Sequence, residues 1–142
     1  MKRRAALGSL LLAPLAWPCL AAADADVQAA IRAAAGDAEP QEGGIVLSLP
    51  ARAENGAQVP VTVLVDSPQT AELHVQAITL IATRNPTPGV ASFRLSPSLA
   101  RAELQTRVRL AEDQTLIAIA RMSDGTVRRA AAEARVVAGG CV

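Results

Sequence analysis

The sequence predicts an all-β protein, an immunoglobulin-like antiparallel β-sandwich of about seven strands. One observation is a period-two alternation of apolar and polar residues in several short segments, which is typical of half-buried strands. A second is the turn signals that separate these segments roughly every 8 to 12 residues. A third is the composition, 51% hydrophobic but only 1% aromatic, so the core has to be built from Val, Ile, Leu and Ala.

Residues 1–23 have the three-part pattern of a secretory signal peptide. Residues 2–4 are basic, an apolar run follows to about residue 15, and small residues come next. The apolar run is shorter than the roughly 20 residues that cross a bilayer. Cleavage after Ala23 satisfies the small-x-small rule, with Ala25 as the second choice. The paired arginines leave the twin-arginine and the general export route both open.

A short alanine-rich helix is expected over residues 24–35, at the start of the mature domain. Asp24 or Asp26 can cap its N-terminus, and Gly36 can end it. We expect this helix to cover one end of the domain or to pack on a partner. Cys19 follows a Trp-Pro pair, which makes a poor site for lipid attachment, so this cysteine belongs to the discarded segment.

The strands of the sandwich are expected within the domain of residues 24–137, except that the last strand extends one residue beyond it, to residue 138. Asn55-Gly56 and Asp124-Gly125 mark tight turns between them. Prolines, which cannot donate to a strand ladder, end the third strand. The expected strands cover residues 44–50, 59–65, 75–83, 90–97, 101–111, 114–122 and 126–138.

The alternation also predicts which side of a strand faces the core. The segment 114–122 is the most continuously apolar, as a central strand would be. In an earlier strand four valines share one face: Val59, Val61, Val63 and Val65. In a later strand polar and charged residues lie opposite a second set: Ala102, Leu104, Thr106, Val108 and Leu110.

The composition argues against several classes of function. Lys and Arg total 14 and Asp and Glu total 13, with no basic stripe, so nucleic acid is not an expected partner. Tyr is absent and Phe occurs once, so there is no aromatic platform for bases or sugars. One His and one cysteine in the mature chain are too few ligands for a metal site. We expect no cofactor and no membrane span.

The body of the domain contains one formal catalytic set. Asp66, Ser67 and His74 are close in the sequence, so Ser-His-Asp catalysis is formally possible. It ranks third, after the two functions of the C-terminal cysteine that are described in the next paragraph. No nucleophile elbow of the G-x-S-x-G kind is present. Asp66-Ser67-Pro68 is better interpreted as a turn, and His74 as a water-exposed residue at the start of a strand. The arginines of the strands are interpreted as solvated side chains that keep sheet edges from pairing.

Residues 138–142 are expected to form a flexible arm that carries a thiol. Gly139 and Gly140 have access to many backbone states and should free the end from the sheet. Cys141 on such a tether can enter another protein's cleft, which suits a group that is handed from site to site. An unpaired cysteine in a secreted chain also fits a crosslink to a second copy or to a partner of an immunoglobulin-like interaction module. An incidental cysteine at a frayed end is the remaining alternative.

Three stretches give the chain a likeness to a known family: ENGAQVPVTVLVDSP, ARMSDGT and the terminal GGC. They resemble SoxY, the sulfur-carrier subunit of the bacterial Sox thiosulfate-oxidising system, over most of the mature chain. The resemblance implies an immunoglobulin-like sandwich in the periplasm that forms a heterodimer with a second sandwich subunit, SoxZ. It also implies that Cys141 holds the sulfur substrate covalently, so that the chain is a carrier and not an enzyme.

The resemblance further implies a set of partner enzymes. In this family a c-type cytochrome, SoxAX, joins thiosulfate oxidatively to the cysteine, and a hydrolase, SoxB, then releases sulfate. SoxCD oxidises the remaining sulfane sulfur where it is present. The chain departs from the family pattern at its end, because the usual GGCGG is GGCV here. The arm is therefore shorter beyond Cys141, and the terminal carboxylate of Val142 lies close to the sulfur.

Overall fold

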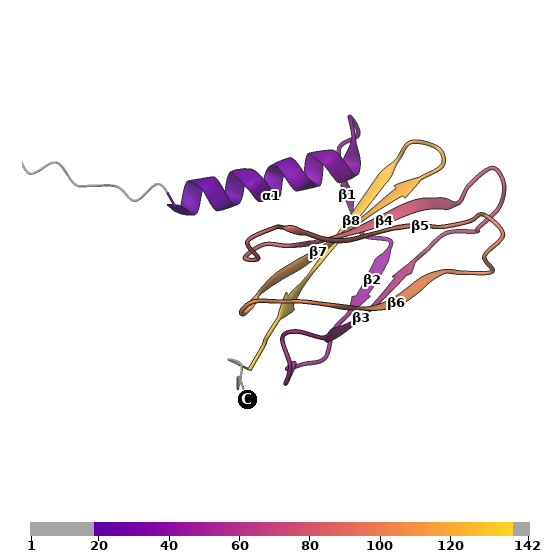
Figure 1. The fold of residues 1–142 in the computed structure, drawn as a ribbon. Helices are drawn as coiled ribbons and strands as arrows, with labels where there is room; N and C mark the ends of the chain where they lie inside the picture. Colours follow the sequence, from indigo (N-terminus) through magenta and orange to yellow (C-terminus); the bar gives the residue numbers. More distant parts are fainter. Residues whose placement is uncertain (1–18, 138–142) are drawn as a thin grey trace, which may run out of the picture.

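The computed structural model describes residues 19–137, with side chains from residue 23 onward, and shows a two-sheet sandwich with one helix (Figure 1). The predicted immunoglobulin-like sandwich is confirmed, and each expected strand is present. The elements are α1 (Cys19–Ala35), β1 (Gln41–Glu42), β2 (Ile45–Ser48), β3 (Val59–Val65), β4 (Val75–Ala82), β5 (Gly89–Arg94), β6 (Ala102–Val108), β7 (Gln114–Met122) and β8 (Val127–Ala134).

The strands form one sheet of five and one of three. The larger sheet has the order β1-β8-β7-β4-β5, and the smaller one has the order β2-β3-β6. The pairs β2–β3, β3–β6, β4–β5, β4–β7 and β7–β8 are antiparallel. β7 lies in the middle of the larger sheet, as predicted from its continuously apolar sequence.

Aliphatic side chains fill the space between the two sheets. The four valines of β3 that were predicted to share a face are all buried there. From the larger sheet, Ile78 and Leu116 belong to the same cluster, and both are 0% exposed. In β6 the predicted inward face is confirmed at Ala102 and Val108. Leu110 is also buried, but it lies beyond the end of that strand.

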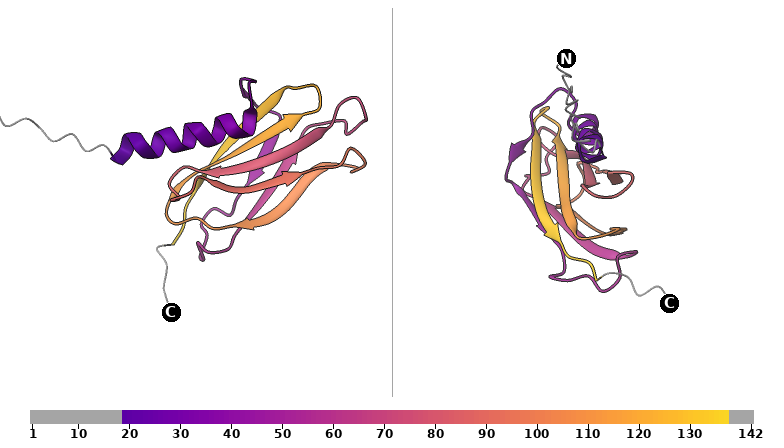
Figure 2. Two further views of the ribbon diagram at one scale, coloured as in Figure 1. Left: turned by 45° about the horizontal axis from the view of Figure 1, so that its top comes forward. Right: turned by 90° about the vertical axis from the view of Figure 1, so that its left-hand side faces the viewer.

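Helix α1 covers the outer side of the larger sheet (Figure 2). Its Val27 belongs to a buried cluster with Ile81 of β4 and with Ile117 and Ile119 of β7. β7 is therefore buried on both faces, which is why its sequence is apolar almost throughout. This cluster is separate from the one between the sheets, so the domain is built in three layers.

The helix extends further toward the N-terminus than predicted. It begins at Cys19 instead of Asp24, because the segment before Asp24 is rich in alanine, the strongest helix former. It therefore runs through the predicted cleavage point after Ala23. No helix among residues 19–137 is long and apolar enough to cross a membrane.

The chain from residue 41 to residue 53 passes from one sheet to the other and back. β1 pairs with β8 in parallel, β2 pairs with β3 in the other sheet, and Ala53 returns to a parallel bridge with Val136. Gly43 and Gly44 start the crossing at φ angles of 104° and 73°, which glycine adopts without steric cost. The sequence did not predict these two parallel contacts, because such short edge pairings depend on tertiary packing.

The predicted Asp124-Gly125 turn closes the β7–β8 hairpin. Gly125 has a φ angle of 87°. Asp124 Oδ1 accepts the hydroxyl of Thr126 at 2.6 Å and the backbone N–H of the same residue at 2.9 Å. Both hydrogen bonds favour the ionised carboxylate, the hydroxyl most of all, so they hold the pKa of Asp124 below its ordinary value.

Replacing Ile81 with alanine should lower the free energy of unfolding by about 2–5 kcal/mol, because the side chain is fully buried beneath α1 and its loss leaves a cavity. Leu99→Ala is the control, since Leu99 is 42% exposed and its truncation should cost less than about 0.5 kcal/mol. Urea unfolding followed by far-UV circular dichroism measures both changes. Equal values for the two variants would contradict the packing of α1 on the sheet.

The Thr126→Val substitution should raise the pKa of Asp124 toward its ordinary value, because it removes the hydroxyl donor. In the unaltered protein the lowered pKa stabilises the fold above the ordinary aspartate pKa, and this stabilisation is lost as the pH falls through the lowered pKa. In the variant the folded-state pKa lies closer to the ordinary value, so this stabilisation should be smaller and should be lost over a narrower pH range. NMR titration of the Asp124 carboxyl carbon tests this, and an unchanged pKa would show that the hydroxyl is not the cause.

Candidate functional site

The predicted site residues Gly139, Gly140 and Cys141 lie outside the residues that the structure describes. The structure does describe the segment that leads to them, residues 135–137, after the end of β8. The described part of the candidate site therefore consists of the residues that hold this segment.

β8 brings the chain to one end of the sandwich, beside the loop that precedes β3 (Figure 1). Its ladder with β7 ends at the pair Ala134–Gln114. Beyond that pair the backbone contacts Ala53 instead. The Ala53 N–H donates to the Arg135 carbonyl at 2.8 Å, and the Val137 N–H donates to the Ala53 carbonyl at 2.9 Å. The chain is thus hydrogen-bonded to the sandwich as far as Val137.

Asp113 holds the other side of the same segment. Its Oδ1 accepts the backbone N–H of Val136 at 2.7 Å. Successive residues of an extended chain face opposite sides, so the amides of Val136 and Val137 need acceptors in two directions. Asp113 supplies one acceptor and Ala53 supplies the other.

Gly56 lies against this segment from the turn before β3. In that turn Asn55 Oδ1 accepts the Ala57 N–H at 2.9 Å, and the Leu110 N–H donates to the Gly56 carbonyl at 2.8 Å. A Cβ atom at Gly56 would lie 2.6 Å from the Leu110 carbonyl oxygen and 2.8 Å from Val136 Cγ1. The position therefore needs glycine because of this close approach and not because of its backbone conformation, while the turn itself is the one that the sequence predicted.

A network of hydrogen bonds around the buried Gln114 fixes the loop that carries Asp113. Gln114 is 4% exposed, and its Nε2 donates to Asn85 Oδ1 at 2.9 Å and to the Glu112 carbonyl at 3.0 Å. Asn85 Oδ1 also accepts the Ala111 N–H at 3.0 Å. The residues on both sides of Asp113 are therefore held in place. The only sequence signal for this network was a glutamine at the head of an apolar strand.

The described side chains do not form the catalytic set that Asp66, Ser67 and His74 could have made. The Ser67 hydroxyl donates to Gln69 Oε1 at 3.0 Å, while His74 Nδ1 lies 3.0 Å from the Thr70 carbonyl oxygen. His74 does precede β4 directly, as predicted, but it is half-buried, so the expectation that it is exposed to water is wrong. Its ring is turned toward its own loop.

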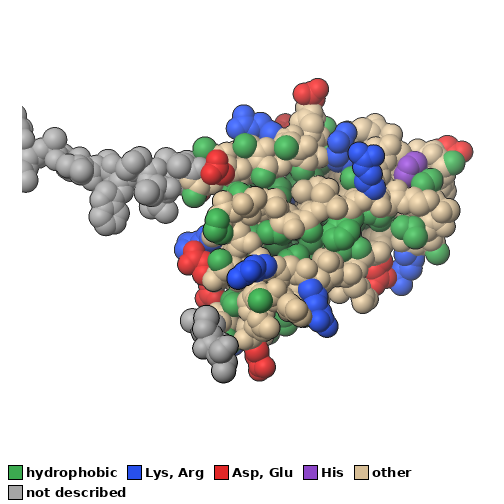
Figure 3. All heavy atoms as spheres, in the orientation of Figure 1, with side chains coloured by type: hydrophobic (Ala, Val, Ile, Leu, Met, Phe, Trp, Pro, Cys, Tyr) green, Lys and Arg blue, Asp and Glu red, His purple; other side chains and the backbone are tan. Residues whose placement is uncertain are grey.

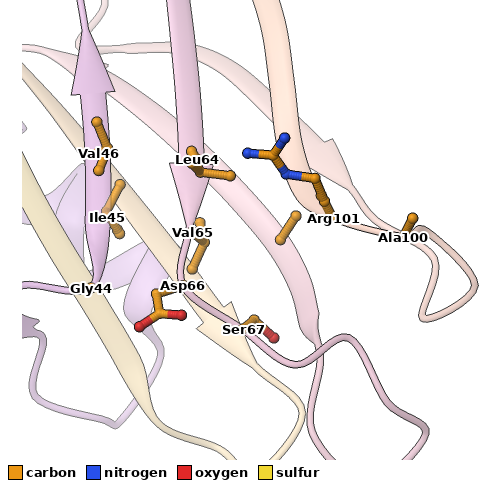
Figure 4. Close-up of a pocket in the computed structure, with 10 residues that line it drawn as sticks. Gly44, Ile45, Val46, Leu64, Val65, Asp66, Ser67, Ala100 and Arg101 are labelled. Carbon is orange, nitrogen blue, oxygen red and sulfur yellow. The ribbon is translucent and has the colours of Figure 1, made fainter.

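A hollow of about 540 Å³ lies at the other end of β3, where Asp66 and Ser67 line it together with Val46, Leu64 and Arg101 (Figure 4). The Arg101 side chain points toward Leu64 in this view. Since Gly56 precedes β3 and Asp66 follows it, the hollow and the C-terminal segment lie at opposite ends of that strand. Among the side chains from residue 23 to residue 137 there is no group of three or more His, Cys, Asp and Glu that could hold a metal ion.

The charges on the described surface are mixed. On the face shown in Figure 3, basic and acidic side chains are scattered and do not gather into a patch of one sign. Described ion pairs join Arg84 to Glu112 at 3.8 Å and Arg129 to Glu42 at 2.6 Å. The first of these is solvent-exposed on both sides and contributes little to stability.

Comparison with known proteins identifies the family. The model of the family described as "Sulfur oxidation protein SoxY" matches residues 31–141, which is most of the chain. The chain belongs to the SoxY family. The solved structure of the sulfur carrier protein SoxY from Chlorobium limicola f thiosulfatophilum is 32% identical in sequence, with a TM-score of 0.66. The similarity covers 80% of this chain and 98% of that chain. Among curated proteins, none matches the sequence.

Other similar structures share only the fold. The superoxide reductase (neelaredoxin) from Ignicoccus hospitalis is 18% identical, covers 67% of this chain and 81% of its own, and gives a TM-score of 0.58. The superoxide reductase from Nanoarchaeum equitans is 13% identical, covers 68% and 98%, and gives a TM-score of 0.56. Sequences of low identity to this chain thus adopt a similar sandwich.

One of the stretches that suggested SoxY now has a structural role. ENGAQVPVTVLVDSP contains Gly56, which packs on the last described residues, and the whole of β3. The sequence indicated the turn and the strand but not the residues against which Gly56 packs. Asp113, Asn85 and Gln114 were not among the predicted site residues.

Gly56→Ala should lower the free energy of unfolding by about 1–3 kcal/mol, because the new methyl group overlaps a backbone carbonyl that cannot move freely. Gly89→Ala is a matched control, since nothing lies within 4 Å of a Cβ atom there. Neither glycine has a positive φ angle, so the backbone tolerates alanine at both sites. Urea unfolding of the two variants should separate them, and equal stability would show that the approach at Gly56 is not tight.

Proposed function

We propose that this SoxY-family chain is a periplasmic carrier that holds sulfur substrates covalently on Cys141 during thiosulfate oxidation. The observation that supports this most directly is the extent of the family match, which runs as far as Cys141. Of the two cysteines in the chain, the other is Cys19, inside the predicted signal peptide. Cys141 is then the one thiol left in the mature chain for substrate attachment.

The chemistry proposed for Cys141 has two steps. In the first, the thiol and thiosulfate form a disulfide bond, Cys–S–S–SO₃⁻, and lose one proton and two electrons to a c-type cytochrome of the SoxAX kind. In the second, water attacks the sulfonate sulfur under catalysis by a SoxB-like hydrolase. Sulfate leaves with two protons, and Cys–S–S⁻ remains on the carrier. A SoxCD-like enzyme would oxidise this remaining sulfur where it is present.

Under this proposal the chain supplies the attachment point, and separate proteins supply catalysis. The geometry of the described end agrees with that division of labour. Cys141 is four residues beyond Val137, which is the last described residue and is hydrogen-bonded to the sandwich, and four residues span at most roughly 14 Å. That length is enough to place a sulfur atom inside another protein's cleft. A SoxZ-like subunit is the proposed partner in a heterodimer.

The proposed location requires export and removal of residues 1–23. Among the side chains described from residue 23 onward, the buried ones of α1 begin at Val27, which lies after the proposed cleavage point. The described contacts of α1 with the sheet therefore belong to the part of the helix that stays in the mature chain. Cleavage after Ala23 is therefore compatible with the same three-layer fold.

Intact-mass spectrometry of the protein from cells grown on thiosulfate should show adducts of about +32 Da for an added sulfur atom or about +112 Da for the thiosulfate adduct, both removable by reducing agent. The Cys141→Ser variant should carry neither. The same spectra give the N-terminal mass and so test cleavage after Ala23.

Two outcomes would overturn the proposal. Unmodified thiol alone under these conditions would exclude a carrier. A stable disulfide-linked species on non-reducing gels, lost in Cys141→Ser and accompanied by no sulfur adduct, would favour a crosslinked interaction module instead.

A further inference from the structure

We propose that Asp113 and Gly56 are positioning residues that fix where the C-terminal segment leaves the sandwich. With Ala53 they form what we call the exit clamp. The inference rests on the proposed function, because the clamp matters for sulfur transfer only if Cys141 is the carrier. It concerns residues far from Cys141 in the sequence, and none of them was expected to serve the site.

The clamp acts where the regular sheet has stopped. The β7–β8 ladder ends at the pair Ala134–Gln114. The residue before Gln114 is Asp113, and its carboxylate takes the place of the next backbone acceptor by binding the Val136 N–H at 2.7 Å. A side chain therefore continues a ladder that the backbone of β7 no longer supports.

Ala53 holds residues 135–137 from the side opposite Asp113, and Gly56 packs against the Val136 side chain. Ala53 exchanges two backbone hydrogen bonds with residues 135 and 137, at 2.8 and 2.9 Å. Gly56 lets the Val136 side chain pack directly on the turn, since a Cβ atom would lie 2.8 Å from Val136 Cγ1. Three consecutive residues are thus fixed by contacts in three directions.

Hydrogen bonds of the neighbouring residues hold the Asp113 carboxylate in a fixed position. Asp113 is exposed, yet its neighbour Gln114 is buried and bonded to Asn85 and to the Glu112 carbonyl. Asn85 also binds the Arg109 carbonyl at 2.7 Å through its Nδ2. A buried glutamine is costly to leave without hydrogen-bond partners, and here its partners hold the loop that presents the carboxylate.

The clamp sets the reach of the sulfur. Measured from Val137, Cys141 can lie at most roughly 14 Å away, whereas measured from Ala134, seven residues back, it could lie up to roughly 24 Å away. The volume open to the thiol would then grow about fivefold, and its effective concentration at a partner's active site would fall in proportion. The clamp therefore keeps the thiol concentrated near one end of the domain.

The test compares Asp113→Ala with Asp113→Asn and Asp124→Ala in the full mature protein. Asp124→Ala is the matched control, because it also removes an exposed carboxylate that accepts a backbone N–H, but at the β7–β8 turn. Water-exchange NMR at the Val136 and Val137 amides should show exchange about threefold to tenfold faster in Asp113→Ala. Asp113→Asn keeps an acceptor oxygen and should restore the slow exchange, and Asp124→Ala should leave it unchanged.

A second measurement separates positioning from general stability. Loading of Cys141 with thiosulfate by the partner cytochrome should slow in Asp113→Ala, by at most about fivefold because that value corresponds to complete release of the segment, whereas reaction with a small aromatic disulfide reagent should keep its rate. Unchanged amide exchange in Asp113→Ala would overturn the clamp, as would equal slowing in Asp124→Ala. If the unaltered protein takes up no sulfur at all, the proposed function fails, while the exchange measurements still decide whether the clamp exists.

Discussion

The position of the last described residues, 135–137, depends on the path of residues 41–53 beside β8. An edge strand presents unpaired N–H and C=O groups that invite pairing with another chain. Here β1 pairs with the start of β8, and Ala53 pairs with the residues after its end. Between these points the chain leaves to complete the smaller sheet as β2. One stretch of chain thus protects the edge of one sheet, extends the other sheet and fixes the last described residues.

The larger sheet carries these contacts, and its central strands β4 and β7 are buried on both faces. Its inner face meets the smaller sheet, and its outer face meets α1. The core contains Val, Ile, Leu, Ala and one Met, with a single half-buried Phe at its margin. Such side chains are compact and have few rotamers, so two thin layers of them can hold strand positions closely. The polar network at Asn85 and Gln114 adds a fixed point at the end where the C-terminal segment leaves.

Much of this fold was predictable because strand periodicity is a local property. The alternation of the β3 valines and the continuously apolar β7 follow directly from which faces are buried. The two-residue β1 was not predictable, since its pairing depends on where β8 lies in space. At the candidate site, Asn55-Gly56 indicated a turn, but its packing against Val136 requires three distant segments to meet. Asp113 was missed for the same reason, because an exposed aspartate in a loop carries no signal of its own.

The parallel contacts along β8 have a mechanical consequence. A partner that grips the C-terminal segment and pulls along the strand loads the hydrogen bonds to β1, to Ala53 and to β7 together, in shear, because these neighbours lie alongside β8. Peeling would instead break such bonds one after another. A force on the C-terminal segment would therefore be shared among these hydrogen bonds, and β8 should stay in the sheet.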